Sequence, residues 1–155
     1  MAVKVGDKAP AFALNNTANE KIALSDYEGK NLIVLFFPLA FTSVCTEELC
    51  TMRDNMAEYQ KLNAEVVAIS VDSPFTLGKF KGEQKLDFPL LSDFNKEASN
   101  AYGAIYDDFF GMKGVSKRSA FVIDKEGAVR YAEVLDNAGN LPNFEAIKET
   151  LGQLN

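Results

Sequence analysis

The sequence predicts an α/β fold in which a mixed central sheet is flanked by helices. Segments 32–37 and 65–71 are largely apolar on both faces, as strands in the middle of a covered sheet are. A helical pattern follows each of these two strands. The last third of the chain then shows two strands with a tight turn between them and a closing amphipathic helix, which adds antiparallel strands to the sheet.

The first half of the chain begins with two short strands, 11–14 and 21–24, separated by a polar turn, which predicts an N-terminal hairpin. The central strand 32–37 ends at Pro38, which has no N–H group for a ladder hydrogen bond. Apolar side chains then recur at three- and four-residue steps over 43–62, as they do on the buried face of a helix.

The second half begins with strand 65–71, after which Ser73 and Pro74 have the residue types of a helix N-cap and first turn. The remaining predicted elements are a strand at 88–91, a helix at 96–102, an irregular loop at 107–115, a hairpin of strands 119–123 and 128–134, and a helix at 143–154. This order is that of a thioredoxin-like fold with an N-terminal hairpin extension, and we expect residues 1–155 to form a single domain.

Composition excludes some classes of partner. Of the 155 residues, 47% are hydrophobic and 25% charged, and the formal net charge is -6. An acidic chain without clustered Lys and Arg is a poor binder of nucleic acid and of anionic membranes. The first ten residues contain no signal-peptide pattern, and the longest apolar run is too short to span a bilayer. We therefore expect a cytoplasmic protein.

The chain contains no histidine. This absence removes Ser-His-Asp and Cys-His catalysis, because no imidazole is present to act as a base. It also removes the commonest ligand of zinc and haem iron, and we expect neither a metal nor a cofactor.

The two cysteines, Cys45 and Cys50, lie in the first turns of the predicted helix that follows the central strand. Unpaired backbone N–H groups at a helix start favour a negatively charged sulfur, so a reactive thiolate at Cys45 is plausible. Thr42, three residues earlier, could hydrogen-bond the sulfur or an incoming oxygen. The alternative is that Thr42 only caps the helix and Cys45 is a small buried apolar residue.

Three further residues are candidates for this site. Pro38 would fix the loop before the helix and shield the sulfur, or would simply end the strand. Glu48, one turn after the first cysteine, could orient a cation, accept backbone N–H bonds or be a favourable first-turn acid. Arg118 begins a core strand and could offer its guanidinium to a thiolate and to a developing oxyanion, although spacing alone favours a surface arginine.

The spacing of the cysteines sets a geometric condition. Five residues along one α-helix separate two Cα atoms by roughly 8–9 Å, beyond the approximate 7 Å limit for a disulfide. A Cys45–Cys50 bond therefore requires local unwinding of the helix. The alternative is that Cys50 is a core residue.

With these residues in place, the chain resembles the peroxiredoxins over nearly its whole length. Pro38, Thr42 and Cys45 match the family's Pro-x-x-x-Thr-x-x-Cys motif, and the family's distant arginine falls on Arg118. The resemblance implies a thioredoxin-like fold and a thiol-dependent peroxidase with Cys45 as the peroxidatic thiolate. Thr42 and Arg118 would hold the peroxide, and Pro38 would shield the sulfur. Glu48 falls where many members carry an acid.

The resemblance points to two subtypes. Cys50 matches the resolving position of the Q type, also called bacterioferritin comigratory protein, whereas segment 36–42 resembles the alkyl hydroperoxide reductase E type, which is generally one-Cys. No cysteine follows Cys50, which argues against the common two-Cys type with a C-terminal resolving thiol.

The implied activity is reduction of hydrogen peroxide and organic hydroperoxides through a sulfenic acid on Cys45. Cys50 would resolve it as an intramolecular disulfide, and a thioredoxin-like or other thiol donor would recycle the enzyme. Three alternatives stay open: a one-Cys peroxidase recycled by an external thiol, a thiol–disulfide oxidoreductase, and a non-enzymatic redox sensor. The second fits poorly, because that chemistry usually uses Cys-x-x-Cys. A homodimer is one expectation for the assembly.

Overall fold

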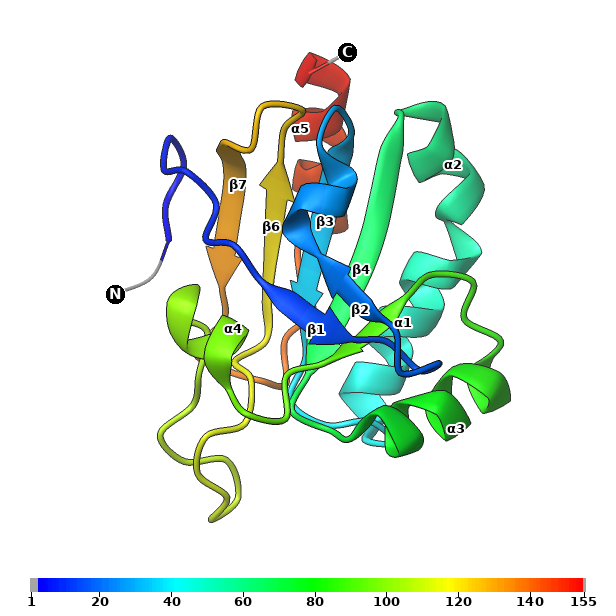
Figure 1. Ribbon diagram of the computed structural model, residues 1–155, viewed down its shortest axis with the longest axis vertical. Helices are drawn as coiled ribbons and strands as arrows, with labels where there is room; N and C mark the ends of the chain where they lie inside the picture. Colours follow the sequence, from blue (N-terminus) through cyan, green and yellow to red (C-terminus); the bar gives the residue numbers. More distant parts are fainter. Residues whose placement is uncertain (1–2, 155) are drawn as a thin grey trace.

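A seven-stranded mixed sheet runs through the centre of the computed structural model, which describes residues 3–154 (Figure 1). Its strands are β1 (Ala13–Asn15), β2 (Lys21–Ala23), β3 (Asn31–Phe36), β4 (Ala64–Ser70), β5 (Leu90–Ser92), β6 (Ser119–Ile123) and β7 (Val129–Val134). They lie in the order β2-β1-β5-β4-β3-β6-β7. Neighbours among β3, β4 and β5 are parallel and the other neighbours are antiparallel, so the predicted α/β fold with a mixed sheet is confirmed.

Helices cover the sheet on both faces (Figure 1). They are α1 (Ser43–Asp54), α2 (Met56–Lys61), α3 (Pro74–Gln84), α4 (Glu97–Ala101) and α5 (Phe144–Leu154), with a 3-10 helix at Leu24–Tyr27. Helices α1, α2, α3 and α5 pack on one face, and α4 with the β1–β2 hairpin lies on the other. No helix in residues 3–154 is long and apolar enough to cross a membrane.

The central strand β3 is apolar throughout because each of its faces is covered. Ile33 and Leu35 point into the core under α1, α2, α3 and α5, whereas Leu32 and Val34 point into the core under α4 and the N-terminal hairpin. Alternation of side chains along a strand produces this division. At about 25 cal/mol per Å² of apolar surface, burial in these two cores supplies the main driving force for folding.

The register of the strands determines which loops meet. Strand β4 runs parallel to β3, so the C-terminal ends of both strands lie at the same edge of the sheet. Strand β6 runs antiparallel to β3 with Phe36 opposite Ser119, which brings the N-terminal end of β6 to that edge. Helix α1 begins there as well (Figure 1).

The predicted helix over 43–62 is wrong in one respect, because it is divided into α1 and α2 at Asn55. The Asn55 backbone is not helical, with φ -107° and ψ 9°, and its side-chain amide donates to the Thr51 carbonyl at 2.8 Å. Asparagine favours such breaks because its side chain competes for backbone hydrogen bonds.

Other boundaries shift by a few residues. Leu24 belongs to the 3-10 helix rather than to a strand, where Asp26 accepts a hydrogen bond from the Ala23 N–H at 2.9 Å. The strand expected at 88–91 begins at Leu90, after Pro89. The predicted start of α3 is confirmed, since the Ser73 hydroxyl accepts from the Thr76 N–H at 3.2 Å.

Candidate active site

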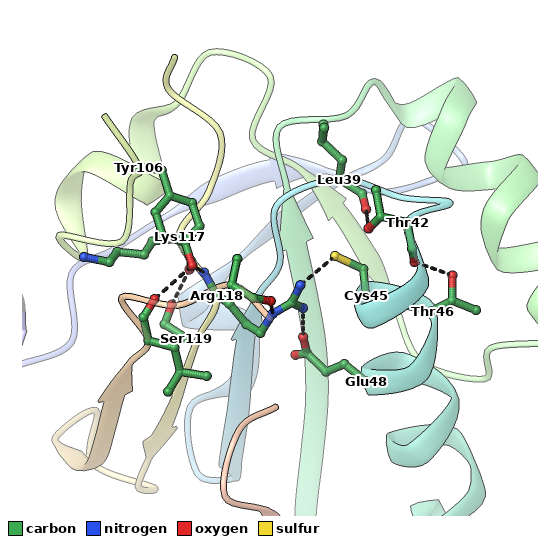
Figure 2. A network of polar contacts seen from close by, with 11 residues as sticks. Leu39, Thr42, Cys45, Thr46, Glu48, Tyr106, Lys117, Arg118 and Ser119 are labelled. Atoms are coloured by element: carbon green, nitrogen blue, oxygen red, sulfur yellow. Dashed lines mark hydrogen bonds and ion pairs between the residues drawn. The ribbon is translucent and has the colours of Figure 1, made fainter. Parts of the chain in front are cut away.

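Cys45 is the third residue of α1 and is fully buried (Figure 2). Thr42 is the N-cap, and the first backbone bond of the helix joins the Thr46 N–H to the Thr42 carbonyl at 2.9 Å. The N–H groups of the first turn therefore have no partner inside the helix. This positive end of the helix dipole favours a negative charge on the Cys45 sulfur.

Arg118 lies immediately before β6 and is only 1% exposed, which excludes the surface position that its spacing favoured. Its Nη2 donates to the Cys45 Sγ at 3.2 Å (Figure 2). Its Nε donates to the Ala138 carbonyl at 2.8 Å. The antiparallel register of β6 against β3 brings this guanidinium to the start of α1. A permanently charged group therefore contacts the sulfur without any histidine.

Glu48 is buried one turn after Cys45, and its Oε1 accepts a hydrogen bond from Arg118 Nη1 at 2.5 Å. Within residues 3–154 its Oε2 has no hydrogen-bond partner. Burial raises the pKa of Glu48 to about 7, because Arg118 offsets only part of the cost of desolvating the carboxylate and Glu133 adds repulsion. Glu48 thus contacts a cation, Arg118, which is the contact that one of the predicted alternatives for Glu48 requires.

Thr42 occupies the N-cap position without capping, since its hydroxyl forms no bond to the first turn. The hydroxyl instead donates to the Leu39 carbonyl at 2.8 Å (Figure 2). Because this bond uses the only hydroxyl proton, the free lone pairs of Thr42 Oγ1 can accept a hydrogen bond from a ligand.

A pocket of about 930 Å³ opens beside these residues and is lined by both Thr42 and Arg118. Its apolar wall comes from the start of α1 and from the loop before β6, with Val44, Phe109 and Met112. Phe110, at the tip of that loop, is 88% exposed. The pocket thus has polar donors and acceptors at one side and an apolar wall at the other.

Cys50 lies further along the same unbroken helix α1, is half-buried and is a free thiol. Its Sγ donates to the Gln84 Oε1 at 3.4 Å, and Arg53 Nη1 donates to the Gln84 carbonyl at 2.6 Å. Cys50 therefore faces the end of α3 and not the core, and the two sulfurs are not brought together.

Pro38 is buried in the loop between β3 and α1. The structure thus gathers Thr42, Cys45, Glu48 and Arg118, with Pro38 next to them in sequence and Cys50 on another side of α1. No three or more Cys, Asp or Glu side chains in residues 3–154 are grouped so as to hold a metal ion.

Sequence reasoning missed several residues around the site. The Ala138 and Leu39 carbonyls hold Arg118 and Thr42, and the Tyr106 hydroxyl accepts from the Arg118 backbone N–H at 3.4 Å while donating to the Leu135 carbonyl at 2.9 Å. Backbone carbonyls leave no signal in a sequence. Of these contacts only that of Tyr106 had any signal in the sequence, as a tyrosine beside the predicted irregular loop 107–115.

Comparisons with known proteins identify the family of this chain. The model of the AhpC/TSA family matches residues 5–132. Peroxiredoxin-2 of Bos taurus is 38% identical over 157 residues, which are 95% of this chain and 75% of the relative. A chloroplastic 2-cysteine peroxiredoxin of Chattonella marina var. antiqua is 39% identical over 145 residues, or 86% and 72% of the two chains.

Among solved structures, the peroxidoxin BcpB of Mycobacterium tuberculosis aligns with a TM-score of 0.87 at 27% identity, over 98% of each chain. The fold is therefore thioredoxin-like, as in peroxiredoxin structures. The chain belongs to the AhpC/TSA family, the peroxiredoxins. It is accordingly a thiol peroxidase, and the predicted family and activity are confirmed at this level.

Proposed function

We propose that Cys45 is the peroxidatic cysteine and that Arg118, Thr42 and the first turn of α1 bind the peroxide beside it. The observation that carries this proposal is the buried guanidinium of Arg118, which reaches the Cys45 sulfur at 3.2 Å in the absence of any histidine. A fixed positive charge in a water-excluded site stabilises both an attacking thiolate and the negative charge that develops on oxygen.

In the first step the Cys45 thiolate attacks the terminal oxygen of the hydroperoxide. A sulfur–oxygen bond forms while the oxygen–oxygen bond breaks, and the leaving oxygen takes a proton to become water or an alcohol. Cys45 becomes a sulfenic acid. The donors of Arg118 and of the α1 first turn face the charge that moves from sulfur to oxygen.

Thr42 acts as an acceptor in this scheme. Its hydroxyl proton is committed to the Leu39 carbonyl, so its oxygen is free to accept the hydroperoxide O–H and to turn the terminal oxygen toward Cys45. Pro38 shields the sulfur from water. The apolar wall of the pocket at Phe109 and Met112 suits the alkyl group of an organic hydroperoxide, and hydrogen peroxide needs no such wall.

The second step joins Cys50 to the oxidised Cys45. The Cys50 thiol displaces the sulfenic hydroxyl, so a disulfide forms and water leaves. Within one intact helix the two Cα atoms are roughly 8–9 Å apart, so α1 unwinds before the bond forms. A thioredoxin-like thiol donor then reduces the disulfide and restores both thiols. On this proposal the chain would act as a Q-type enzyme, although segment 36–42 resembles the E type.

The test is rapid-mixing measurement of peroxide loss. Cys45→Ser must abolish it, whereas Cys50→Ser should complete one fast turnover and then stall without an added thiol. Wild-type rates in Cys45→Ser would refute the assignment. Multiple turnovers by Cys50→Ser with the same donor would instead support the one-Cys alternative, with Cys50 structural.

Three finer expectations stay proposals. A homodimer is supported by the exposed apolar residues Phe110 and Met112 at the rim of the pocket. Analytical ultracentrifugation of the reduced protein tests it. The cytoplasmic location also stays a prediction, as does the organisation of residues 1–155 as one domain.

A further inference from the structure

The loop between β3 and α1 contains a strained residue next to the site. Phe41 has φ +69°, in the left-handed region that bulky side chains rarely adopt. It directly precedes Thr42, and its ring is 49% exposed while packing edge-on against Phe80 with the centroids 5.1 Å apart. Backbone strain of this kind persists only where the surroundings hold the chain in place.

A hydrogen bond next to the strained residue ties this loop to the segment that follows β4. The Ala40 N–H, immediately before Phe41, donates to Asp72 Oδ2 at 2.7 Å. Asp72 follows β4, and the parallel pairing of β3 with β4 places the two loops side by side. The bond thus links the residue before the strained turn to the neighbouring strand.

Asp72 is itself held firmly. The Ser70 hydroxyl donates to the same Oδ2 at 2.7 Å, and the Ser92 hydroxyl donates to the Asp72 carbonyl at 2.6 Å. Ser70 belongs to β4 and Ser92 to β5, so the Asp72 carboxylate is held by β4 and the Asp72 main chain by β5. No ion pair involves Asp72 within residues 3–154, so its carboxylate serves in this network as a hydrogen-bond acceptor.

We infer that Asp72 is a positioning residue for the peroxidase reaction. By holding the Ala40 N–H it keeps Phe41 in the left-handed turn, and this turn sets the direction of Thr42 and of the first turn of α1. Asp72 does not line the pocket and acts through Thr42 and Cys45. The inference rests on the proposed roles of those two residues in binding and attacking the peroxide.

The test is single-turnover peroxide loss, measured with the full-length protein in excess over peroxide, so that only the Cys45 step is seen. Asp72→Ala should lower the rate roughly 10- to 100-fold, the range expected when one charge-assisted hydrogen bond that orients the site is lost. Asp72→Asn should stay within about threefold of wild type, because its amide oxygen still accepts from the Ala40 N–H. Asp87→Ala is the matched control, because Asp87 is an exposed aspartate outside this network, and it should also stay within about threefold.

A double-mutant cycle separates positioning from a general loss of stability. If Asp72 acts through the Thr42 hydroxyl, Asp72→Ala should add no more than about threefold to the effect of Thr42→Val. Fully multiplicative effects would overturn the proposal. So would an Asp72→Ala rate within about threefold of wild type, or an Asp72→Asn variant as slow as Asp72→Ala.

Two controls make each outcome decisive. Asp72→Ser, whose side chain is too short to bond the Ala40 N–H, replaces Asp72→Ala if that variant does not fold. If neither folds, Asp72 is a folding residue and the proposal is wrong. Cys45→Ser is run in parallel, because peroxide loss by that variant refutes the proposed function itself rather than the part given to Asp72.

Discussion

Replacing Arg118 by lysine should slow the reaction of Cys45 with peroxide by roughly 30- to 1000-fold. The Arg118 guanidinium donates hydrogen bonds to three acceptors: the Cys45 Sγ at 3.2 Å, the Glu48 Oε1 at 2.5 Å and the Ala138 carbonyl at 2.8 Å. Lysine keeps the positive charge but carries it on one nitrogen, which cannot span acceptors arranged for a planar fork.

The magnitude follows from the contact to the reacting sulfur. One oriented donor at a developing oxyanion contributes about 2–4 kcal/mol to transition-state stabilisation. Each 1.4 kcal/mol or so corresponds to a tenfold change in rate, which gives the range above. Since Arg118→Lys conserves the positive charge, most of the lost rate reflects the lost orientation of the hydrogen-bond donors.

The assay is peroxide loss in a single turnover with enzyme in excess, sampled by rapid quench, because the chain has no tryptophan to report by fluorescence. Arg130→Lys is the matched control. Arg130 is an exposed residue of β7 that pairs with Asp124 at 2.7 Å, and its replacement should leave the rate within about twofold. An Arg118→Lys rate within about threefold of wild type would refute the reasoning.

Three other predictions concern stability and the resolving step. The pKa of Glu48 is raised from its ordinary 4.5 to about 7, so between these pH values the folded state binds more protons than the unfolded state, and stability falls as pH rises. The Glu48 part of this fall is at most about 1.4 kcal/mol per pH unit. Denaturant unfolding at several pH values should show this contribution in wild type and not in Glu48→Gln. Equal slopes of unfolding free energy against pH for the two proteins would contradict the burial argument. Gln84→Ala removes the acceptor on α3 that holds the Cys50 thiol, so disulfide formation after peroxide addition should be roughly 2- to 10-fold faster. Quenched-flow mass spectrometry measures this rate. A slower rate would mean that this contact favours resolution. Leu49→Ala should lower the unfolding free energy by about 2–5 kcal/mol, because Leu49 is fully buried on α1. Glu47 is exposed on the same helix, and Glu47→Ala should change the unfolding free energy by less than about 0.5 kcal/mol. Similar losses for both variants would contradict the packing of α1.

The sequence predicted the sheet well because its signals are local. Segments 32–37 and 65–71 are apolar on both faces, and this pattern marks central strands whatever the rest of the chain does. The start of α3 at Ser73 was equally clear from its N-cap and proline. The break at Asn55 was missed because the apolar spacing continues across it, and only backbone angles separate α1 from α2.

In the candidate site, too, the residues with a local sequence signal could be predicted and those placed by tertiary structure could not. Cys45 stood out through its place after a strand at a helix start, and spacing showed that Cys50 cannot pair with it in an intact helix. Spacing alone indicated that Arg118 is a surface residue, and only the family motif marked it as a site residue. Spacing misled here because the burial of Arg118 depends on the antiparallel pairing of β6 with β3. Asp72 could not have been found from sequence, since its partner is a backbone N–H that tertiary structure alone brings near.

Mass spectrometry of the wild-type protein after one equivalent of peroxide tests most directly whether oxidation begins at Cys45. After alkylation of remaining thiols and proteolysis, we predict a peptide in which the two cysteines of α1 are joined to each other, and we predict that Arg118→Lys forms it far more slowly. A sulfenic acid that persists on Cys45 would remove Cys50 from the scheme and leave the attack by Cys45 intact. An unmodified Cys45, with peroxide consumed, would contradict the central claim.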